Sequence, residues 1–278
     1  MKFPYIFRNG DIVPFAEDTV SIDRTEVAYG FGVYETIKLR NNILYFLPQH
    51  IDRLFHSAQQ INLQHTITPT MIEKGMYDLI SQTQETSYNI KILLYGGNSA
   101  VQNELFMIPS APLYPDRKWY RDGISLISFE HERWMPQAKT LNMLPSYYMF
   151  KKAQEQGHYD ALLYDKNKNV REGTRTNVYV MKGKQIYSPC KKDILAGVTM
   201  LTLEKVLKQS SYSIDYIDIP FAKIGEYDSM FISSTSTKIM PVIQVDYMRY
   251  NTVSQDLKDL IVLYDSALEK SDGNFDAL

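Results

Sequence analysis

The sequence has few of the residues that cross-link secreted proteins or anchor membrane proteins. It has one cysteine, Cys190, so no disulfide can form within the chain, and this usage fits a reducing compartment. No apolar run reaches the roughly 18 residues that a membrane helix needs. Pro4 and Arg8 also interrupt the hydrophobic start before a signal-peptide core could form. We therefore expect a soluble, cytoplasmic protein with no membrane partner.

Neither sign of charge dominates the chain. The 30 basic and 32 acidic residues give a formal charge of −2 and are spread without blocks. This balance argues against binding to nucleic acid through bulk electrostatics. The five histidines show no paired ligand spacing, and no glycine-rich fingerprint follows a strand. We expect neither a metal site nor a dinucleotide site.

Periodic apolar segments predict a chain of mixed helices and strands with a break near its middle. The break, residues 109–123, holds three prolines and a charged cluster, which indicates a linker. We expect two α+β domains, 1–115 and 122–278. Apolar stripes predict helices at 48–61, 70–82, 146–156, 199–209 and 254–268. Short apolar or alternating runs predict strands at 34–39, 43–47, 90–95, 105–108, 125–129, 161–165, 176–181, 185–188, 213–219 and 229–233.

Two segments hold the residues that indicate chemistry. RWMPQAKTLN contains Lys139, and no acidic residue lies between Glu132 and Glu155 to explain this lysine as a surface ion pair with a sequence neighbour. VREGTRTNVYV contains Glu172, which opens a turn before an alternating strand pattern. A lysine amine can form a Schiff base with pyridoxal phosphate, and a carboxylate can keep the pyridine nitrogen protonated. The pair predicts a pyridoxal-phosphate site.

Three further segments suit the phosphate of such a cofactor. Gly197, Val198 and Thr199 begin a helical pattern, where unpaired backbone N–H groups and a hydroxyl meet the positive end of the helix dipole. The SSTST segment, residues 233–237, supplies further hydroxyls. Arg53, in QHIDRL, has a planar guanidinium that can bind phosphate at two points.

In combination these motifs resemble the fold-type IV pyridoxal-phosphate enzymes. This is the class IV aminotransferase family, which includes branched-chain and D-amino-acid aminotransferases and aminodeoxychorismate lyase. The similarity runs from about Ile22 to about Val245. It implies a smaller N-terminal α/β sandwich-like domain and a larger C-terminal pseudo-barrel domain, with the cofactor cleft between them. It also implies a homodimer, which the 21 tyrosines and 12 methionines mildly favour.

The resemblance assigns roles to individual residues. It implies that Lys139 is the catalytic Schiff-base lysine and proton carrier, and that Glu172 contacts the pyridine nitrogen. The cofactor-binding residues that it implies are Arg53, Glu172, Val198, Thr199, Ser234 and Thr235.

The substrate pocket departs from the family pattern. The arginine with which D-amino-acid aminotransferases bind the substrate carboxylate is absent, because Tyr95, Gly96 and Gly97 stand in its place. An α-carboxylate in a partly desolvated cleft needs a cationic partner. Arg175, in the turn after Glu172, and Arg24 are the first candidates, with Arg24 expected to reach the neighbouring subunit. The full set of expected substrate-binding residues is Tyr34, Arg24, Arg175 and Lys91.

Three functions remain open. The first is an aminotransferase that moves an amino group between an amino acid and a 2-oxo acid through a Lys139 Schiff base. The second is an aminodeoxychorismate lyase, which releases pyruvate and 4-aminobenzoate. The third is a catalytically silent cofactor-binding protein, although a silent relative has no chemical need for both Lys139 and Glu172.

Overall fold

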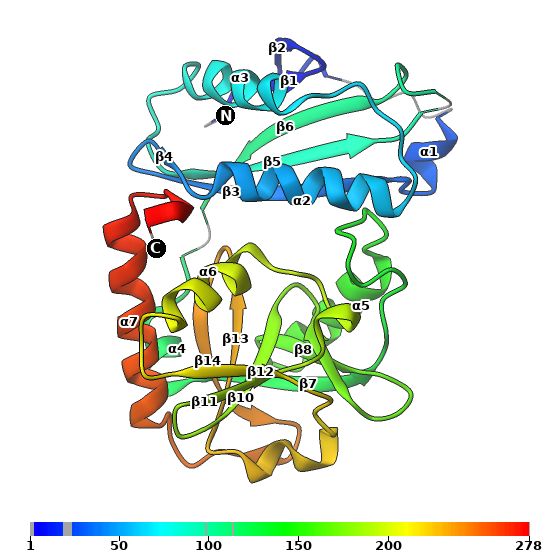
Figure 1. The fold of residues 1–278 in the computed structure, drawn as a ribbon. Coiled ribbons are helices and arrows are strands. Elements are labelled where there is room, and N and C mark those ends of the chain that lie inside the picture. The colour runs from blue at the N-terminus through cyan, green and yellow to red at the C-terminus, as the bar shows by residue number, and fades with distance from the viewer. Residues whose placement is uncertain (1–2, 19–23, 98, 113, 278) are drawn as a thin grey trace. The chain divides into compact units, whose positions relative to one another are not determined.

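The computed structural model describes residues 3–18, 24–97, 99–112 and 114–277 (Figure 1). The chain divides into two compact units. Unit 1 consists of Met1–Pro112, Ala138–Met143 and Gly273–Phe275, and unit 2 of Leu113–Gln137, Leu144–Asp272 and Asp276–Leu278. Both units combine strands with helices, so the expected α+β class is confirmed. None of the helices in the described ranges is both long and apolar enough to span a bilayer.

Unit 1 is built on a six-stranded sheet in the order β2-β1-β6-β5-β3-β4. All neighbouring strands pair antiparallel. Short turns join β1 to β2 and β3 to β4, as antiparallel pairing allows. The longest pairing joins β3 to β5 from Gly32↔Tyr95 to Leu39↔Tyr88. The strands are β1 (Tyr5–Arg8), β2 (Asp11–Pro14), β3 (Gly32–Arg40), β4 (Ile43–Leu44), β5 (Tyr88–Tyr95) and β6 (Glu104–Ser110).

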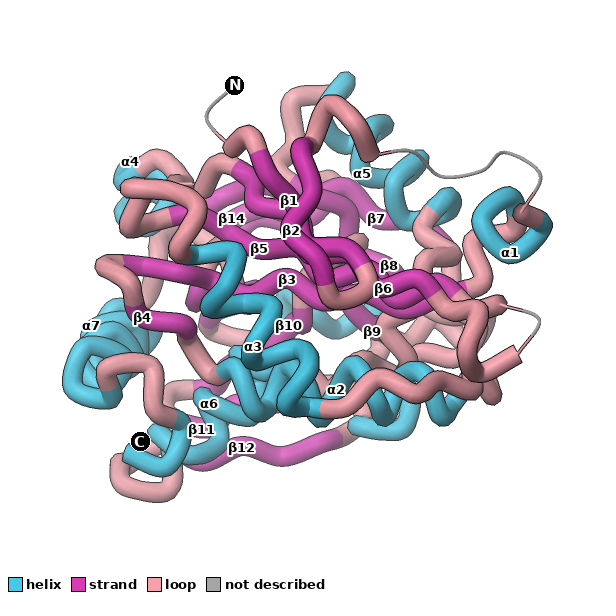
Figure 2. The backbone as a smooth tube through the Cα atoms, turned by 90° about the horizontal axis from the view of Figure 1, so that it is seen from above, coloured by secondary structure: helices cyan, strands magenta, loops and turns pink. Residues whose placement is uncertain are grey.

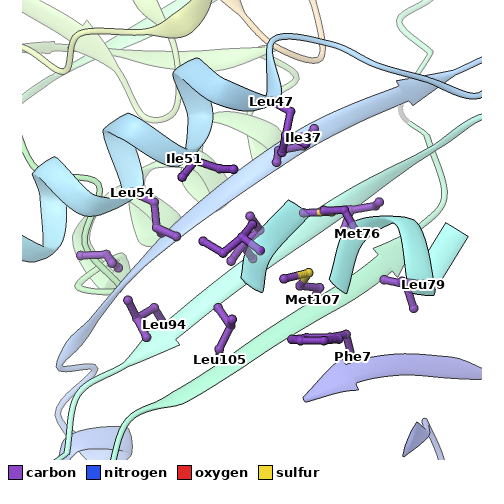
Figure 3. Close-up of a cluster of buried hydrophobic side chains, with 14 of the residues drawn as sticks. Phe7, Ile37, Leu47, Ile51, Leu54, Met76, Leu79, Leu94, Leu105 and Met107 are labelled. Carbon is purple, nitrogen blue, oxygen red and sulfur yellow. The ribbon is translucent and has the colours of Figure 1, made fainter. Parts of the chain in front are cut away.

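Helices α2 (Leu47–Gln60) and α3 (Pro69–Ile80) supply the apolar side chains that cover this sheet, and α1 is the short helix Thr25–Ala28. The buried positions of α2 recur at helical spacing and point toward the strands, as Leu47, Ile51 and Leu54 do in Figure 3. Helix α3 adds Met76 and Leu79 to the same core, so the two predicted helices of this half are confirmed.

The two faces of the sheet differ because side chains alternate along a strand. On β3, Val33, Ile37 and Leu39 belong to the core beneath the helices. Tyr34 on β3 and Lys91 on β5 occupy the alternate positions, whose side chains point to the other face of the sheet. Tyr34 is half-buried there and Lys91 is exposed. The helix-free face therefore carries these polar side chains.

Unit 2 contains a nine-stranded mixed sheet in the order β12-β11-β10-β13-β14-β7-β8-β9, with β15 on β14. An additional pairing of β9 with β10, at Glu172↔Asn177, closes six of the strands into a ring. This ring confirms the expected pseudo-barrel. The strands are β7 (Ile124–Glu130), β8 (Asp160–Tyr164), β9 (Val170–Gly173), β10 (Asn177–Lys182), β11 (Gln185–Ser188), β12 (Ser213–Tyr216), β13 (Ser229–Ser234), β14 (Lys238–Val245) and β15 (Met248–Arg249).

The interior of unit 2 is apolar, with Leu126, Val178 and Ile232 among its fully buried residues. Helix α5 adds Met149 and Ala153 to a second small cluster against β8. In Figure 2 the helices are cyan, the strands are magenta and the loops that connect these elements are pink. The helices are α4 (Arg117–Asp122), α5 (Leu144–Glu155), α6 (Val198–Leu207) and α7 (Gln255–Ser271), with 3-10 turns η1 (Lys191–Asp193), η2 (Phe221–Glu226) and η3 (Phe275–Ala277).

Candidate active site

Lys139 is held by its backbone on both sides. Its N–H donates to Oγ of the buried Ser57 at 3.0 Å, and its carbonyl accepts from the N–H of Tyr34 at 3.0 Å. The next peptide continues this pairing, because Leu141 N–H donates to the Gly32 carbonyl at 2.9 Å. The segment thus forms a short extra ladder at the edge of β3, which explains why Lys139 belongs to unit 1.

Two lysine amines approach one aromatic ring in unit 1. Lys139 Nζ lies 4.4 Å from the centroid of the Tyr34 ring, and Lys91 Nζ lies 5.5 Å from it. The Tyr34 hydroxyl donates to Sδ of Met143 at 3.4 Å, which fixes the direction of the ring. Ammonium groups are attracted to the face of an aromatic ring, and two of them make this spot attractive to an anion.

Behind this face, Glu35 is fully buried and links two residues of α2. It accepts from Arg53 Nε at 2.6 Å, from Arg53 Nη2 at 2.8 Å and from His50 Nδ1 at 2.8 Å. Burial opposes ionisation of Glu35, but the charge of Arg53 and the hydrogen bonds of Arg53 and His50 outweigh it and hold the pKa of Glu35 far below its usual range. Burial lowers the pKa of His50, so the neutral ring donates from Nδ1. Arg53 is therefore fixed by a two-point contact with a carboxylate.

In unit 2, Glu172 is buried and held by Arg133. Arg133 Nε donates to Glu172 Oε1 at 2.6 Å, whereas Oε2 receives only longer contacts, from Arg133 Nη2 at 3.4 Å and from Leu195 N–H at 3.5 Å. A carboxylate oxygen accepts more than one hydrogen bond. Oε2 therefore keeps acceptor capacity for a ligand N–H.

Asn177 connects the Glu172 strand pair to the beginning of α6. Its Nδ2 donates to the Leu195 carbonyl at 2.8 Å. A Cβ atom on Gly197 would lie 2.2 Å from Asn177 Oδ1, so only glycine fits there. Gly197 is the N-cap of α6, and among the described residues no side chain forms a cap hydrogen bond at this end of the helix. The first N–H groups of α6, at Val198 and Thr199, can thus bind an anion.

Ser234 is the last residue of β13, the strand that pairs with β10, and Thr235 follows it in the turn between β13 and β14. Asn177 pairs with Ser233, so these hydroxyls and the start of α6 are both tied to the same strand. Ser234 Oγ lies 2.8 Å from Thr237 Oγ1 and accepts from Thr237 N–H at 3.2 Å. The predicted phosphate residues of unit 2 are therefore brought together around Asn177.

The arginines considered for the substrate are already engaged. Arg24 forms an ion pair with Glu104 and donates to the carbonyls of Gly96 at 2.9 Å and Gln102 at 3.2 Å, all within unit 1. Arg175 is exposed, and its guanidinium carbon lies 3.9 Å from the centroid of the Phe150 ring. Lys91, by contrast, has no carboxylate within salt-bridge distance in the described part of the chain.

One cluster in unit 2 has donor atoms that could hold a metal ion: Cys190, Asp193 and Asp218, within 4.8 Å of one another. Arg171 Nη1 donates to both aspartates, at 3.2 and 3.3 Å. The positive charge that these carboxylates need is thus supplied by a guanidinium.

Sequence reasoning gave no role to four of these residues. Arg133 and Asn177 lie in the two motif segments with Lys139 and Glu172, and Glu35 lies in the strand predicted at 34–39, but no local pattern assigns these three side chains a partner. The signal for His50 was available, because it lies three residues before Arg53 on the buried face of α2. Its spacing predicts a shared partner for both side chains.

The residues present fit pyridoxal 5′-phosphate. The group needs an amine for its aldehyde, a carboxylate for its ring nitrogen and donors for its phosphate. Lys139, the open oxygen of Glu172 and the uncapped first turn of α6 provide these three. Glu172 is held by its contact with Arg133, and Lys139 is held by its backbone.

Comparison with known proteins identifies the family. The model of the family described as amino-transferase class IV matches residues 32–245. The D-alanine aminotransferase of Bacillus licheniformis is 27% identical over 247 residues, which are 86% of this chain and 87% of that protein. The D-alanine aminotransferase of Staphylococcus aureus strain N315 is 26% identical over 259 residues, 87% of this chain and 89% of its own length.

Solved structures show the same fold at lower identity. The branched-chain aminotransferase of Thermoproteus uzoniensis, solved with norvaline, superposes with a TM-score of 0.86 at 20% identity and covers 95% of this chain and 94% of its own. The branched-chain enzyme of Escherichia coli gives 0.84 at 20% identity, over 94% and 92% of the two chains. None of these relatives carries the name of a lyase. The chain therefore belongs to the class IV aminotransferases, enzymes that transfer amino groups with pyridoxal 5′-phosphate.

Proposed function

We propose that this aminotransferase uses Lys139 as its catalytic amine. In this proposal, an amino acid gives up its amino group to the cofactor and a 2-oxo acid takes it back. Pyridoxal phosphate, when bound, supplies the aldehyde carbon and the electron-accepting ring. Lys139 holds the cofactor through its Nζ and, as a free amine, moves a proton at that same atom.

The observation that carries the proposal is the anchoring of Lys139. Both its N–H and its carbonyl are hydrogen-bonded, to Ser57 and Tyr34, while its amine is left beside the Tyr34 ring. A proton carrier must return to one position in every cycle, and a fixed backbone reduces the volume that its amine explores.

The other cofactor residues divide the remaining work in this proposal. Glu172 Oε2 accepts the ring N–H, while Arg133 holds Oε1 and orients the carboxylate. The N–H groups of Val198 and Thr199, the hydroxyls of Ser234 and Thr235, and Arg53 bind the phosphate. Glu35 keeps the guanidinium of Arg53 in one orientation.

For the substrate carboxylate we favour Lys91. It lies on the same sheet face as Lys139 and Tyr34, whereas Arg24 is paired with Glu104 and Arg175 is stacked on Phe150. A compact ammonium beside an aromatic ring can form a charge-assisted contact with a carboxylate. The names of the relatives make D-alanine the first amino donor to test.

We further propose a cytoplasmic homodimer. The single cysteine suits a reducing compartment, and exposed aromatic and aliphatic side chains in unit 2 suit a contact between copies. The side chains are those of Trp134, Leu144, Tyr147 and Tyr148. Sedimentation equilibrium measures the mass directly, and a monomer at micromolar concentration would contradict the dimer.

Borohydride reduction of the cofactor-loaded enzyme, followed by peptide mapping, tests the lysine. We expect the label on Lys139 in the wild type and in Lys91→Met, and no label at this site in Lys139→Ala. Because both amines approach the same ring, a label on Lys91 would contradict the assignment.

Incubation with separate pools of D- and L-amino acids then tests the reaction. Conversion of the bound cofactor to its amino form is expected with D-alanine, and no conversion in either pool would reject an amino-acid substrate.

A further inference from the structure

Asp160, the first residue of β8, is a fully buried carboxylate in unit 2. Its Oδ1 accepts from the Thr174 hydroxyl at 2.5 Å and from the Ala161 N–H at 2.8 Å. Its Oδ2 accepts from the Thr176 hydroxyl at 3.4 Å. Asp160 therefore accepts hydrogen bonds from two threonine hydroxyls, those of Thr174 and Thr176, which lie two residues apart in the sequence.

These two threonines belong to the turn between β9 and β10. The turn is closed by a hydrogen bond from Gly173 N–H to the Thr176 carbonyl at 2.8 Å, and the strand pair beside it is Glu172↔Asn177. The turn lies directly against the carboxylate. A Cβ atom on Gly173 would be 2.0 Å from Thr176 Oγ1 and 3.1 Å from Asp160 Oδ2.

The position is costly for a carboxylate. Burial raises the pKa of Asp160, while the Thr174 hydrogen bond and the charge of Arg175 act against this. Within the described ranges no basic side chain forms an ion pair with Asp160. An apolar side chain would fill the same volume at a lower desolvation cost. Packing therefore does not explain why a carboxylate occupies this position. Its hydrogen bonds to the Thr174 and Thr176 hydroxyls do.

We propose that Asp160 is a positioning residue that holds the 173–176 turn and, through it, sets the direction of Glu172. This inference rests on the proposed role of Glu172. Side chains alternate along a strand, so a slip of one residue at the turn would rotate Glu172 to the other face of β9. Two hydroxyl contacts on either side of Arg175 prevent this slip. The contact acts by hydrogen bonding, so an amide can replace the acid.

A double-mutant cycle with matched controls tests the inference. The variants are Asp160→Ala, Asp160→Asn, Glu172→Gln and the double variant Asp160→Ala/Glu172→Gln. The control is Asp165→Ala, which also removes a buried carboxylate from the β8–β9 hairpin but at its other end, where Asp165 accepts from Asn167 and Asn169 N–H at 2.9 and 2.8 Å. Asp165 also forms an ion pair with Arg171, so this control removes a contact to β9 without touching the 173–176 turn. Two measurements are made on each: the single-turnover rate with amino acid, and hydrogen exchange of the peptide spanning 170–178 in the cofactor-free protein.

We expect Asp160→Ala to lower the single-turnover rate at least 30-fold and to accelerate exchange in the turn. Asp160→Asn should stay within threefold of the wild type. In the Glu172→Gln background, Asp160→Ala should lower the rate no more than twofold further, because its effect passes through Glu172. Asp165→Ala should reduce stability and leave the single-turnover rate within threefold of the wild type.

Four results would overturn the inference. The first is a full 30-fold loss in the Glu172→Gln background, which would show that Asp160 acts independently. The second is an equal loss of rate in Asp160→Ala and Asp165→Ala, which would show a general effect on folding. If Asp160→Ala does not fold, Thr174→Val removes the stronger contact, and an unchanged rate and exchange pattern there would also reject the inference. A Glu172→Gln enzyme with unchanged kinetics would instead reject the proposed function of Glu172 and this inference together.

Discussion

Glu35→Gln should destabilise unit 1 more than any exposed charge substitution. The variant keeps the volume of the side chain but removes the negative charge of the fully buried Glu35, which holds the half-buried Arg53 guanidinium by two hydrogen bonds. Removing one partner of a buried ion pair costs about 3–5 kcal/mol. The exposed pair Lys74–Asp78 on α3 is the control, since Asp78→Asn should cost less than about 1 kcal/mol.

The assay must report on unit 1 alone. Both tryptophans, Trp119 and Trp134, lie in unit 2, so intrinsic tryptophan fluorescence does not follow unit 1. Hydrogen exchange of peptides from β3 and α2 does. A loss of about 1.4 kcal/mol in the free energy of unfolding makes exchange through unfolding about tenfold faster. The expected loss of about 3–5 kcal/mol should therefore make the protected amides of unit 1 exchange roughly 100-fold faster or more. A difference below about 1 kcal/mol between Glu35→Gln and the wild type would refute the reasoning.

The same residue gives a pH dependence with a definite sign. The pKa of Glu35 is lower in the folded chain than the usual glutamate value of 4.5. A depressed carboxyl pKa stabilises the fold above the unfolded value, and this stability is lost as the pH falls toward the folded value. Wild-type stability should therefore decline below about pH 5, where the unfolded carboxyl begins to take up protons, more steeply than that of Glu35→Gln. Parallel curves for the two proteins would contradict the assignment.

Four shorter predictions concern the site. Lys139→Ala should abolish turnover while cofactor still binds, which equilibrium dialysis with an activity assay checks. Glu172→Gln should slow the single-turnover rate by one to several decades, roughly 1.4 kcal/mol each, with a smaller loss of cofactor affinity. Lys91→Met should raise KM for amino acids at least tenfold and leave amines that lack a carboxylate unaffected; equal effects on both would remove Lys91 from the carboxylate site. Gly197→Ala should displace Asn177, because the new Cβ would be 2.2 Å from its Oδ1, and weaken cofactor binding about tenfold, measured by dialysis.

The sequence predicted the elements whose patterns are regular. All five expected helices are present, because each carries an apolar stripe at helical spacing. Strand β14 was not predicted, although it lies between β13 and β7. Its sequence KIMPVIQV contains Pro241, which normally excludes a central strand, and pairing with β7 begins only after it, at Val242. Helix α4 lies in the segment interpreted as a linker, where prolines hid a six-residue helix with Asp116 as its cap.

Within the site, short-range patterns were informative and long-range ones were not. Lys139 and Glu172 stood out by their local motifs, but nothing local pairs Glu172 with Arg133, 39 residues earlier. The Asp160 contacts with Thr174 and Thr176 are invisible for the same reason, since they depend on the pairing of β8 with β9. The surroundings of each cation also depend on the fold. Lys91 and Arg24 carry the same charge, but Lys91 is exposed beside the Tyr34 ring whereas Arg24 is ion-paired with Glu104.

The pairing of residues 138–143 with the edge of β3 has a consequence for the order of folding. On the ribosome, the strand that receives Lys139 is complete about a hundred residues before Lys139 itself is synthesised, by the numbering of Val33 and its partner Thr140. Until then the backbone at the start of β3 lacks this partner, and Gly273–Phe275, a third piece of unit 1, is synthesised later still. A fragment that stops at Pro112 therefore lacks two pieces of unit 1. To obtain unit 1 in isolation, one would have to supply both missing pieces, residues 138–143 and 273–275, as fused segments or as separate peptides.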